Sequence, residues 1–149
     1  MRRRALTDDL VRLVTQAAFQ VQSPDRSLRL RIRVGLLAVL PGVGVPVASA
    51  VLALVEPEEY GIIDVRAWEQ VFGAPKSKFS DTDYLRYMRR VWKLAEELGW
   101  APQRVEWCIW QLTESACVPD SEGDEVWLDS SKVSAVLNVR SEIRAEGRG

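Results

Sequence analysis

The chain has 149 residues, enough for one domain with a real hydrophobic core, and its 20 Lys and Arg against 21 Asp and Glu leave a formal net charge of −1. This balance excludes a global field that draws the protein to nucleic acid or to an anionic membrane, so any such attraction requires a local patch. The absence of histidine excludes Ser-His-Asp and Cys-His catalysis, and the two cysteines exclude a disulfide framework, which favours a reducing, cytoplasmic location.

Two helices are predicted before the hairpin sequence described next. The first is expected to begin after Thr7, a suitable N-cap, and to end at about Gln22. The second is expected over about residues 27–39, with apolar residues on one side and arginines on the other. The apolar side of this helix is expected to consist of Leu28, Ile32, Leu36 and Val39. The arginines at positions 2, 3, 4, 26, 29, 31 and 33 suggest a local basic face.

The motif LPGVG at residues 40–44 must break the second helix, because proline and glycine disfavour a helix interior. A third helix is expected over about residues 45–55, since Pro46 fits a first helical turn and small residues follow it. The sequence therefore predicts two helices joined by a hairpin at about residues 28–56.

Three further helices are predicted after this hairpin. Asp64 is a suitable N-cap for a short helix that ends at Gly73. Ser80 opens the longest helix, which ends before Gly99, and Pro102 begins another.

The remainder of the chain gives weaker signals. The acidic segment at residues 118–130 is expected to be a mobile loop, with a faint strand tendency at 125–128. Residues 131–145 are expected to form a weaker terminal helix. The expected fold class is therefore all-α, a single-domain helical bundle over residues 1–149.

The uncharged run from Val34 to Val55 has three interpretations. Its length suits a membrane span, but Pro41 to Pro46 at its centre would leave broken backbone hydrogen bonds in hydrocarbon. The second interpretation is a purely structural pair of packed helices. In the third, backbone N–H groups near Gly42 and Gly44 bind phosphate beside the positive end of the next helix dipole. Such contacts position a DNA duplex without reading its sequence.

LPGVG, followed by small residues, resembles the helix-hairpin-helix motif of the DNA glycosylase superfamily, which includes endonuclease III and the alkyladenine glycosylases. In that family an aspartate with a role in glycosidic chemistry follows the hairpin after one helix and a loop. In YGIIDVRAW, Asp64 lies twenty residues after Gly44, as the pattern requires. The resemblance covers about residues 28–72. It implies docking on DNA backbone through Leu40, Pro41, Gly42, Val43, Gly44 and Val45.

Asp64 is the catalytic residue that the resemblance implies. Breaking an N-glycosidic bond develops positive charge on the sugar, which a carboxylate can stabilise while it orients a water. Bifunctional family members carry a lysine two residues after the second hairpin glycine, where this chain has Pro46. The expected activity is therefore a monofunctional N-glycosidase without AP-lyase activity, excising a modified or mismatched base in base-excision DNA repair. Capping of the following helix alone also explains Asp64.

The extruded base is expected to meet aromatic side chains, with Tyr60 and Trp68 as base-pocket candidates. The tryptophans at 92, 107 and 110 are further candidates, and core packing is the alternative for each aromatic residue. Arg66 is expected either to bind a phosphate or to pair with Glu69.

The resemblance also implies a monovalent cation, K⁺ or Na⁺, on the backbone carbonyls of Leu40 and Val43. No organic cofactor and no iron–sulfur cluster is expected. Family members devote more chain to the second lobe of the base pocket. The pocket is therefore expected to be shallow, completed by a second subunit of a homo-oligomer, or absent.

Two other functional classes remain open. One is a noncatalytic DNA-binding or scaffold protein that retains the hairpin. The other is a protein-interaction module whose apolar hairpin faces a partner.

Overall fold

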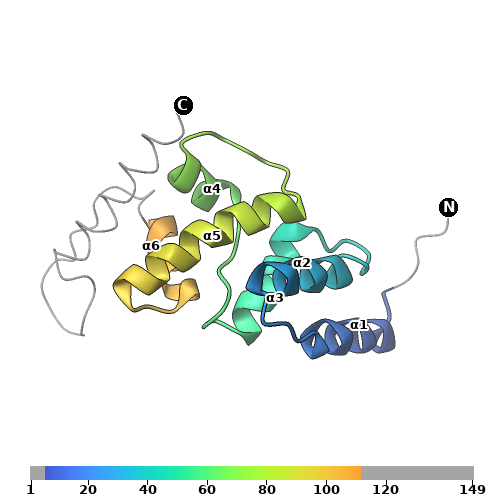
Figure 1. The fold of residues 1–149 in the computed structure, drawn as a ribbon. Helices are drawn as coiled ribbons and strands as arrows, with labels where there is room; N and C mark the ends of the chain where they lie inside the picture. Colours follow the sequence, from blue (N-terminus) through green and yellow to red (C-terminus); the bar gives the residue numbers. More distant parts are fainter. Residues whose placement is uncertain (1–5, 112–149) are drawn as a thin grey trace, which may run out of the picture.

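The computed structural model describes residues 6–111, which form six α-helices (Figure 1). These helices are α1 (Asp8–Gln20), α2 (Arg26–Leu37), α3 (Val45–Val55), α4 (Val65–Phe72), α5 (Asp81–Leu98) and α6 (Pro102–Gln111). No strand occurs among the described residues, so the predicted all-α class is confirmed. The predicted loop at 118–130, the strand tendency at 125–128 and the helix at 131–145 lie outside them.

Local capping signals explain where several helices begin. Thr7 caps α1 as predicted, and its side chain accepts a hydrogen bond from the N–H of Leu10. Ser80 caps α5 in a capping box, because Asp83 also accepts the Ser80 N–H at 2.8 Å. Asp25, which the sequence analysis did not use as a cap, starts α2 slightly earlier than predicted.

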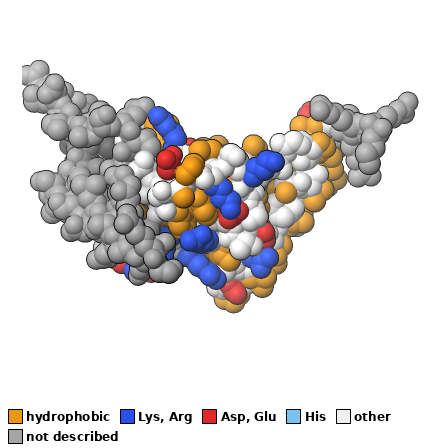
Figure 2. Space-filling view, turned by 90° about the horizontal axis from the view of Figure 1, so that it is seen from above, with side chains coloured by type: hydrophobic (Ala, Val, Ile, Leu, Met, Phe, Trp, Pro, Cys, Tyr) orange, Lys and Arg blue, Asp and Glu red, His pale blue; other side chains and the backbone are white. Residues whose placement is uncertain are grey.

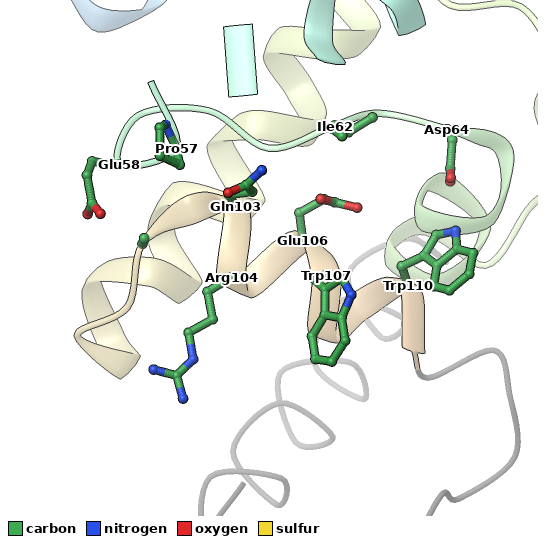
Figure 3. A pocket seen from close by; sticks show the side chains of 10 residues that line it. Pro57, Glu58, Ile62, Asp64, Gln103, Arg104, Glu106, Trp107 and Trp110 are labelled. Atoms are coloured by element: carbon green, nitrogen blue, oxygen red, sulfur yellow. The ribbon is translucent and has the colours of Figure 1, made fainter. Parts of the chain in front are cut away.

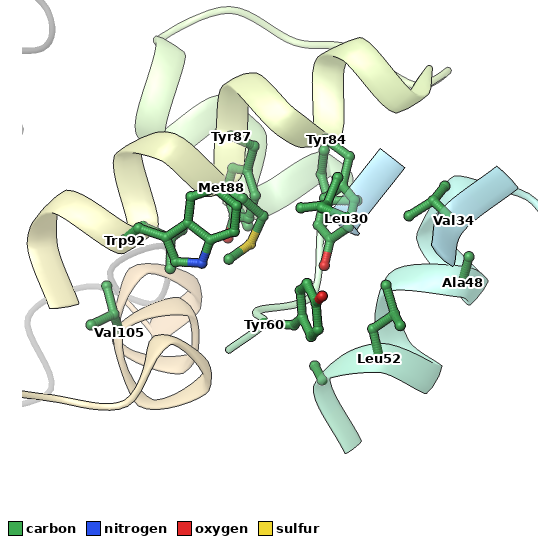
Figure 4. Close-up of a cluster of buried hydrophobic side chains, with 14 of the residues drawn as sticks. Leu30, Val34, Ala48, Leu52, Tyr60, Tyr84, Tyr87, Met88, Trp92 and Val105 are labelled. Atoms are coloured by element: carbon green, nitrogen blue, oxygen red, sulfur yellow. The ribbon is translucent and has the colours of Figure 1, made fainter. Parts of the chain in front are cut away.

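Helix α5 is central to the fold. It packs against α2, α3, α4 and α6, whereas α1 packs on α2 at the edge of the molecule (Figure 1). One cluster of buried side chains joins these helices (Figure 4). Its members include Leu30 and Val34 of α2, Ala48 and Leu52 of α3, Tyr84, Tyr87, Met88 and Trp92 of α5, and Val105 of α6.

The buried face of α2 differs from the predicted one. Leu28 and Ile32 are 49% and 40% exposed. The residues that α2 buries are Leu30, Arg33, Val34 and Leu37. Arg33 can be buried because it pairs with Glu56 and donates to the Val21 carbonyl at 3.1 Å. The prediction that all the arginines lie opposite the apolar side is therefore wrong.

Each arginine of α2 pairs with an acid, and Arg2, Arg3 and Arg4 lie outside the described residues, so the suggested basic face stays a prediction. The partners of the α2 arginines are Glu59 and Glu96 for Arg26, Glu59 for Arg29, Asp81 for Arg31, and Glu56 for Arg33. Figure 2 shows Lys and Arg side chains interspersed with acidic and apolar ones over one face of the molecule. Binding of an anionic partner therefore cannot depend on the arginines of α2 as a free basic patch.

Residues 56–64, the linker between α3 and α4, are fixed by side chains of the neighbouring helices. From α5, the Tyr84 hydroxyl donates to the Gly61 carbonyl at 2.9 Å, and the Trp92 indole donates to the Glu59 carbonyl at 2.7 Å. From α3, the Ser49 hydroxyl accepts the Ile63 N–H at 3.1 Å. These bonds hold the backbone that leads into residue 64.

The uncharged run from Val34 to Val55 forms the end of α2, a turn, and α3. Within residues 6–111, no helix combines the length and the apolar character that a membrane crossing requires.

Candidate active site

A pocket of about 1060 Å³ lies between the linker and α6 (Figure 3). The linker side is formed by Pro57, Glu58, Ile62 and Asp64, and the helix side by Ala101, Gln103, Arg104, Glu106, Trp107 and Trp110. This volume is at the upper end of ordinary small-molecule sites. The lining combines indole rings and aliphatic side chains with carboxyl, amide and guanidinium groups.

Asp64 lies in this pocket and also caps α4. Its Oδ1 atom accepts the Ala67 N–H at 2.6 Å, and the positive end of the helix dipole stabilises its negative charge. Capping uses one carboxylate oxygen. The structural and the chemical interpretations of Asp64 are therefore compatible with each other.

Glu106 of α6 is the second notable carboxyl group of the pocket, and the sequence analysis missed it. It is only 7% exposed, and its side chain extends toward the Asp64 side of the pocket (Figure 3). Burial raises the pKa of Glu106 to about 7; a hydrogen bond with the Ile62 backbone opposes this shift, and the charge of Asp64 adds to it. Glu106 therefore exchanges its proton near neutral pH.

The sequence does contain a signal for Glu106. Pro102, Val105, Glu106 and Ile109 recur at the spacing of one helix face, and all four are buried. A glutamate in the apolar stripe of a helix is uncommon, because acidic residues are rarely buried without a partner. Its position among apolar residues, rather than a motif, could have identified it.

Glycine at position 61 allows Glu106 to lie directly against the linker. A Cβ atom at Gly61 would be 2.8 Å from the Cβ of Glu106, closer than side chains tolerate. The two segments are also joined where α6 begins, because the Gln103 N–H donates to the Pro57 carbonyl at 3.2 Å. Any larger residue at position 61 would displace Glu106 or the linker.

A buried hydroxyl group lies close enough to sense both carboxyl groups. Tyr87 of α5 is 0% exposed, and its hydroxyl makes no hydrogen bond within the described part of the chain. Burial raises the pKa of Tyr87 well above its usual value, and the charges of Glu106, Tyr84 and Asp64 contribute to the shift. A buried polar atom without a partner is rare.

The aromatic candidates divide between the core and the pocket. Tyr60 and Trp68 are 0% and 4% exposed and do not line this pocket, so their role as base-pocket residues stays a prediction. The linker carries Tyr60 through the core, while Trp68 packs on Phe72 at 4.1 Å between ring centres. Trp107, which is 42% exposed, and Trp110 line the pocket instead.

Arg66 lies beside the pocket, in contact with the lining residue Trp110. Its guanidinium carbon lies 4.7 Å from the centre of the Trp110 ring, a distance typical of a cation–π contact. Arg104 lines the pocket itself and lies over Trp100. Arg104 therefore lines the pocket, and Arg66 lies beside the ring of Trp110, one of the two indole side chains in the lining.

The turn between α2 and α3 contains the two hairpin glycines, which differ in conformation. Gly42 has a φ of 82°, in the region that favours glycine, and the Val43 N–H donates to the Leu40 carbonyl at 3.1 Å. Gly44 caps α3 with a φ of −92°, which any residue adopts. A Cβ atom at Gly44 would make only an ordinary contact with Pro46, at 3.8 Å. The fold of the turn therefore requires glycine at position 42 and not at position 44.

The predicted cation ligands, the carbonyls of Leu40 and Val43, lie in this turn, and cation binding there stays a prediction. A carbonyl oxygen has two lone pairs, so the hydrogen bond that the Leu40 carbonyl accepts leaves it able to bind a cation together with the Val43 carbonyl. Residues 6–111 contain no cluster of His, Cys, Asp or Glu side chains that could hold a metal ion.

No family model, curated protein or solved structure matches this chain. The resemblance to helix-hairpin-helix glycosylases therefore stays a prediction.

Proposed function

We propose that this protein binds duplex DNA and acts as a monofunctional, glycosylase-like N-glycosidase that removes a modified or mismatched base. One observation supports this function most directly. Asp64, at the spacing from Gly44 that the glycosylase pattern requires, lines a pocket with Glu106, whose pKa is about 7. Hydrolysis of a glycosidic bond commonly uses two carboxyl groups in different environments, one acidic and one ionised.

Asp64 is the group that stabilises the reacting sugar in this proposal. Cleavage of the base–sugar bond leaves positive charge on the sugar, which a nearby carboxylate stabilises. The bond to the Ala67 N–H fixes one oxygen of that carboxylate, so its position does not need to be organised during the reaction. Pro46 cannot form a Schiff base, which leaves water as the nucleophile.

The indole rings of Trp107 and Trp110 receive the base. Extruding a base from the duplex costs a few kcal/mol of stacking and pairing free energy. Stacking of that base on an aromatic side chain contributes about 1–3 kcal/mol in return. Arg66 and Arg104 lie beside this wall and suit the flanking phosphates.

The hairpin holds the DNA backbone in this proposal. The backbone N–H groups of Gly44 and Val45 lie at the positive end of α3, where a phosphate is favourable. The carbonyls of Leu40 and Val43 hold K⁺ or Na⁺, which adds positive charge beside that phosphate. The proposed location is the cytoplasm, and the proposed process is base-excision repair.

Base release tests the proposal. Labelled duplexes with uracil, hypoxanthine, 8-oxoguanine, 7-methylguanine and mismatches are incubated with the protein and then treated with alkali, which cuts at abasic sites. The wild type is expected to give strand breaks only after alkali. Asp64→Asn should reduce the rate by about 100-fold or more. Asparagine caps helices as well as aspartate does, so this variant keeps the α4 cap.

Asp25→Asn is the matched control, because Asp25 caps α2 in the same way and lies far from the pocket in sequence. It should release bases at the wild-type rate. Strand breaks without alkali would contradict the monofunctional assignment. No breaks, together with DNA binding that weakens steeply with salt, would favour the noncatalytic DNA-binding alternative. No DNA affinity at all would favour the protein-interaction module.

A further inference from the structure

Glu106 provides a chemical step that Asp64 alone does not. We propose that Glu106 is the general acid that protonates the departing base, and that the site therefore takes an uncharged base with a protonatable ring nitrogen, such as a purine. This inference rests on the proposed N-glycosidase function and names its substrate class. A carboxyl group can act in this way only if it is protonated, positioned and accessible to the ligand.

The surroundings of Glu106 meet these conditions. Its side chain lines the pocket and is 93% removed from solvent, being 7% exposed. The close approach of Gly61 and the hydrogen bond with the Ile62 backbone fix its position against the linker. With its pKa raised to about 7, Glu106 can hold its proton near neutral pH.

The groups around Glu106 also favour its neutral form. The titratable side chains that interact with it electrostatically are Asp64 at the start of α4, Tyr84 and Tyr87 of α5, and Cys108 of α6. Asp64 is a like charge and not a counter-ion. Arg33, the other charged side chain that is buried within residues 6–111, instead pairs with Glu56. Among residues 6–111, Glu106 forms no salt bridge, although Arg104 lines the same pocket. Burial of a carboxyl group without such a pair is typical of a catalytic acid and not of a structural ion pair.

In the proposed step, Glu106 donates a proton to the base and water is the nucleophile. The bond between the anomeric carbon and the base nitrogen breaks, and its electron pair moves into the base. The Glu106 carboxyl proton moves to a ring nitrogen, so the base leaves as a neutral molecule. Water then adds to the anomeric carbon, and its surplus proton goes to the Glu106 carboxylate, which restores the acid. One water is consumed, and nothing is oxidised or reduced.

This step determines the substrate class. An uncharged purine departs as an anion unless it receives a proton, so a positioned acid accelerates its release by about 10²–10⁴-fold. An alkylated base such as 7-methylguanine already carries a positive charge and departs neutral without a proton. Glu106 contributes little to the release of such a base.

The test compares one substrate whose base must be protonated to depart as a neutral molecule with one whose base departs neutral without a proton. Single-turnover release of hypoxanthine and of 7-methylguanine from matched duplexes is measured for the wild type, Glu106→Gln and Glu97→Gln. Glutamine keeps the shape of the side chain but cannot donate a proton to the base. Glu97 is exposed on α5, so its variant controls for the loss of one negative charge.

Glu106→Gln is expected to slow hypoxanthine release by about 100-fold or more and 7-methylguanine release by less than about threefold. Wild-type hypoxanthine release should decline as pH rises through about 7, and this decline should be lost in Glu106→Gln. If Glu106→Gln slows the release of both substrates equally, or slows neither, the role of Glu106 as general acid is overturned. Base release by the wild type would still support the proposed function. No release of any base by the wild type would overturn both.

Discussion

The Ser49 hydroxyl accepts a hydrogen bond from the Ile63 N–H at 3.1 Å and donates one to the Pro46 carbonyl at 2.7 Å. Pro46 belongs to the first turn of α3, next to the hairpin, and Ile63 immediately precedes Asp64. Ser49 is fully buried. The Ser49 hydroxyl oxygen therefore connects α3 to the linker backbone immediately before Asp64, whose carboxylate lines the pocket.

Replacing Ser49 with alanine should destabilise the fold. The Ile63 N–H would stay buried without a partner, which typically costs about 1–3 kcal/mol. Urea denaturation of the wild type and Ser49→Ala measures this difference. Thr82→Ala deletes an exposed hydroxyl on α5 and should change stability by no more than about 0.5 kcal/mol. Similar effects of the two substitutions would show that the Ser49 bonds contribute nothing.

The two hairpin glycines should respond differently to alanine. Gly42→Ala forces a side chain into a left-handed conformation and should cost about 1–2 kcal/mol of stability. Gly44→Ala has an ordinary φ and ordinary contacts, so its stability should stay within about 0.5 kcal/mol of the wild type. Thermal or urea unfolding checks both values.

Gly44→Ala also tests the proposed phosphate site without damaging the fold. Its methyl group would stand at the N-terminus of α3, where a phosphate must approach the backbone N–H groups. We expect DNA affinity to fall by roughly tenfold, or about 1.4 kcal/mol. Fluorescence anisotropy at fixed salt measures this change. Unchanged affinity in a stable Gly44→Ala protein would argue against docking through the hairpin.

Glu106 should make the protein less stable as pH rises. Its folded pKa of about 7 lies above the ordinary 4.5, so the folded state binds more protons than the unfolded state between these values. The contribution of Glu106 to the free energy of unfolding is fully present below about pH 4.5. It decreases as pH rises and is lost above about pH 7. The total change is on the order of 3 kcal/mol.

Unfolding of Glu106→Gln across the same pH range isolates this contribution. The variant should lack the slope that Glu106 causes, and near pH 8 it should be more stable than the wild type by on the order of 2–3 kcal/mol. A variant that is less stable than the wild type at every pH would show that Glu106 is a structural residue. Glu97→Gln should retain the wild-type slope.

Arg33 should contribute much more to stability than an exposed arginine. Arg33→Met keeps the aliphatic packing but removes the bonds to Glu56 and the Val21 carbonyl. We expect a loss of about 2–4 kcal/mol, because buried acceptors are left without their donor. Arg12→Met breaks an exposed pair with Asp9 and should cost no more than about 1 kcal/mol. Equal losses in urea denaturation would contradict the structural role of Arg33.

Helix ends were predictable from sequence because their signals are local. Thr7, Ser80 and Asp64 cap helices as expected, and Gly73 and Gly99 end helices with φ values of 72° and 65°. Each of these positions depends on a backbone conformation or on a bond to a residue nearby in the chain. The all-α class follows from the same signals.

Burial of charged residues was not predictable in the same way. The expectation that charged side chains face solvent placed all the arginines of α2 on the exposed side. The same expectation overlooked the burial of Glu106 in α6. Arg33 is buried because Glu56 and the end of α1 meet it in the folded molecule. Glu106 lies opposite the linker, which is distant in sequence. Such partners are set by tertiary packing, which no local pattern contains.

Burial of the Glu106 carboxyl group also gives a chain without histidine a proton-exchanging group near neutrality. Histidine is the side chain that ordinarily changes charge between about pH 5 and 8. Here a carboxyl group in the wall of a pocket takes that place. A ligand that displaces water from the pocket further disfavours the charged carboxylate, so its binding should draw a proton from the buffer. Occupancy of the pocket is then readable as proton uptake, even for a ligand with no chromophore.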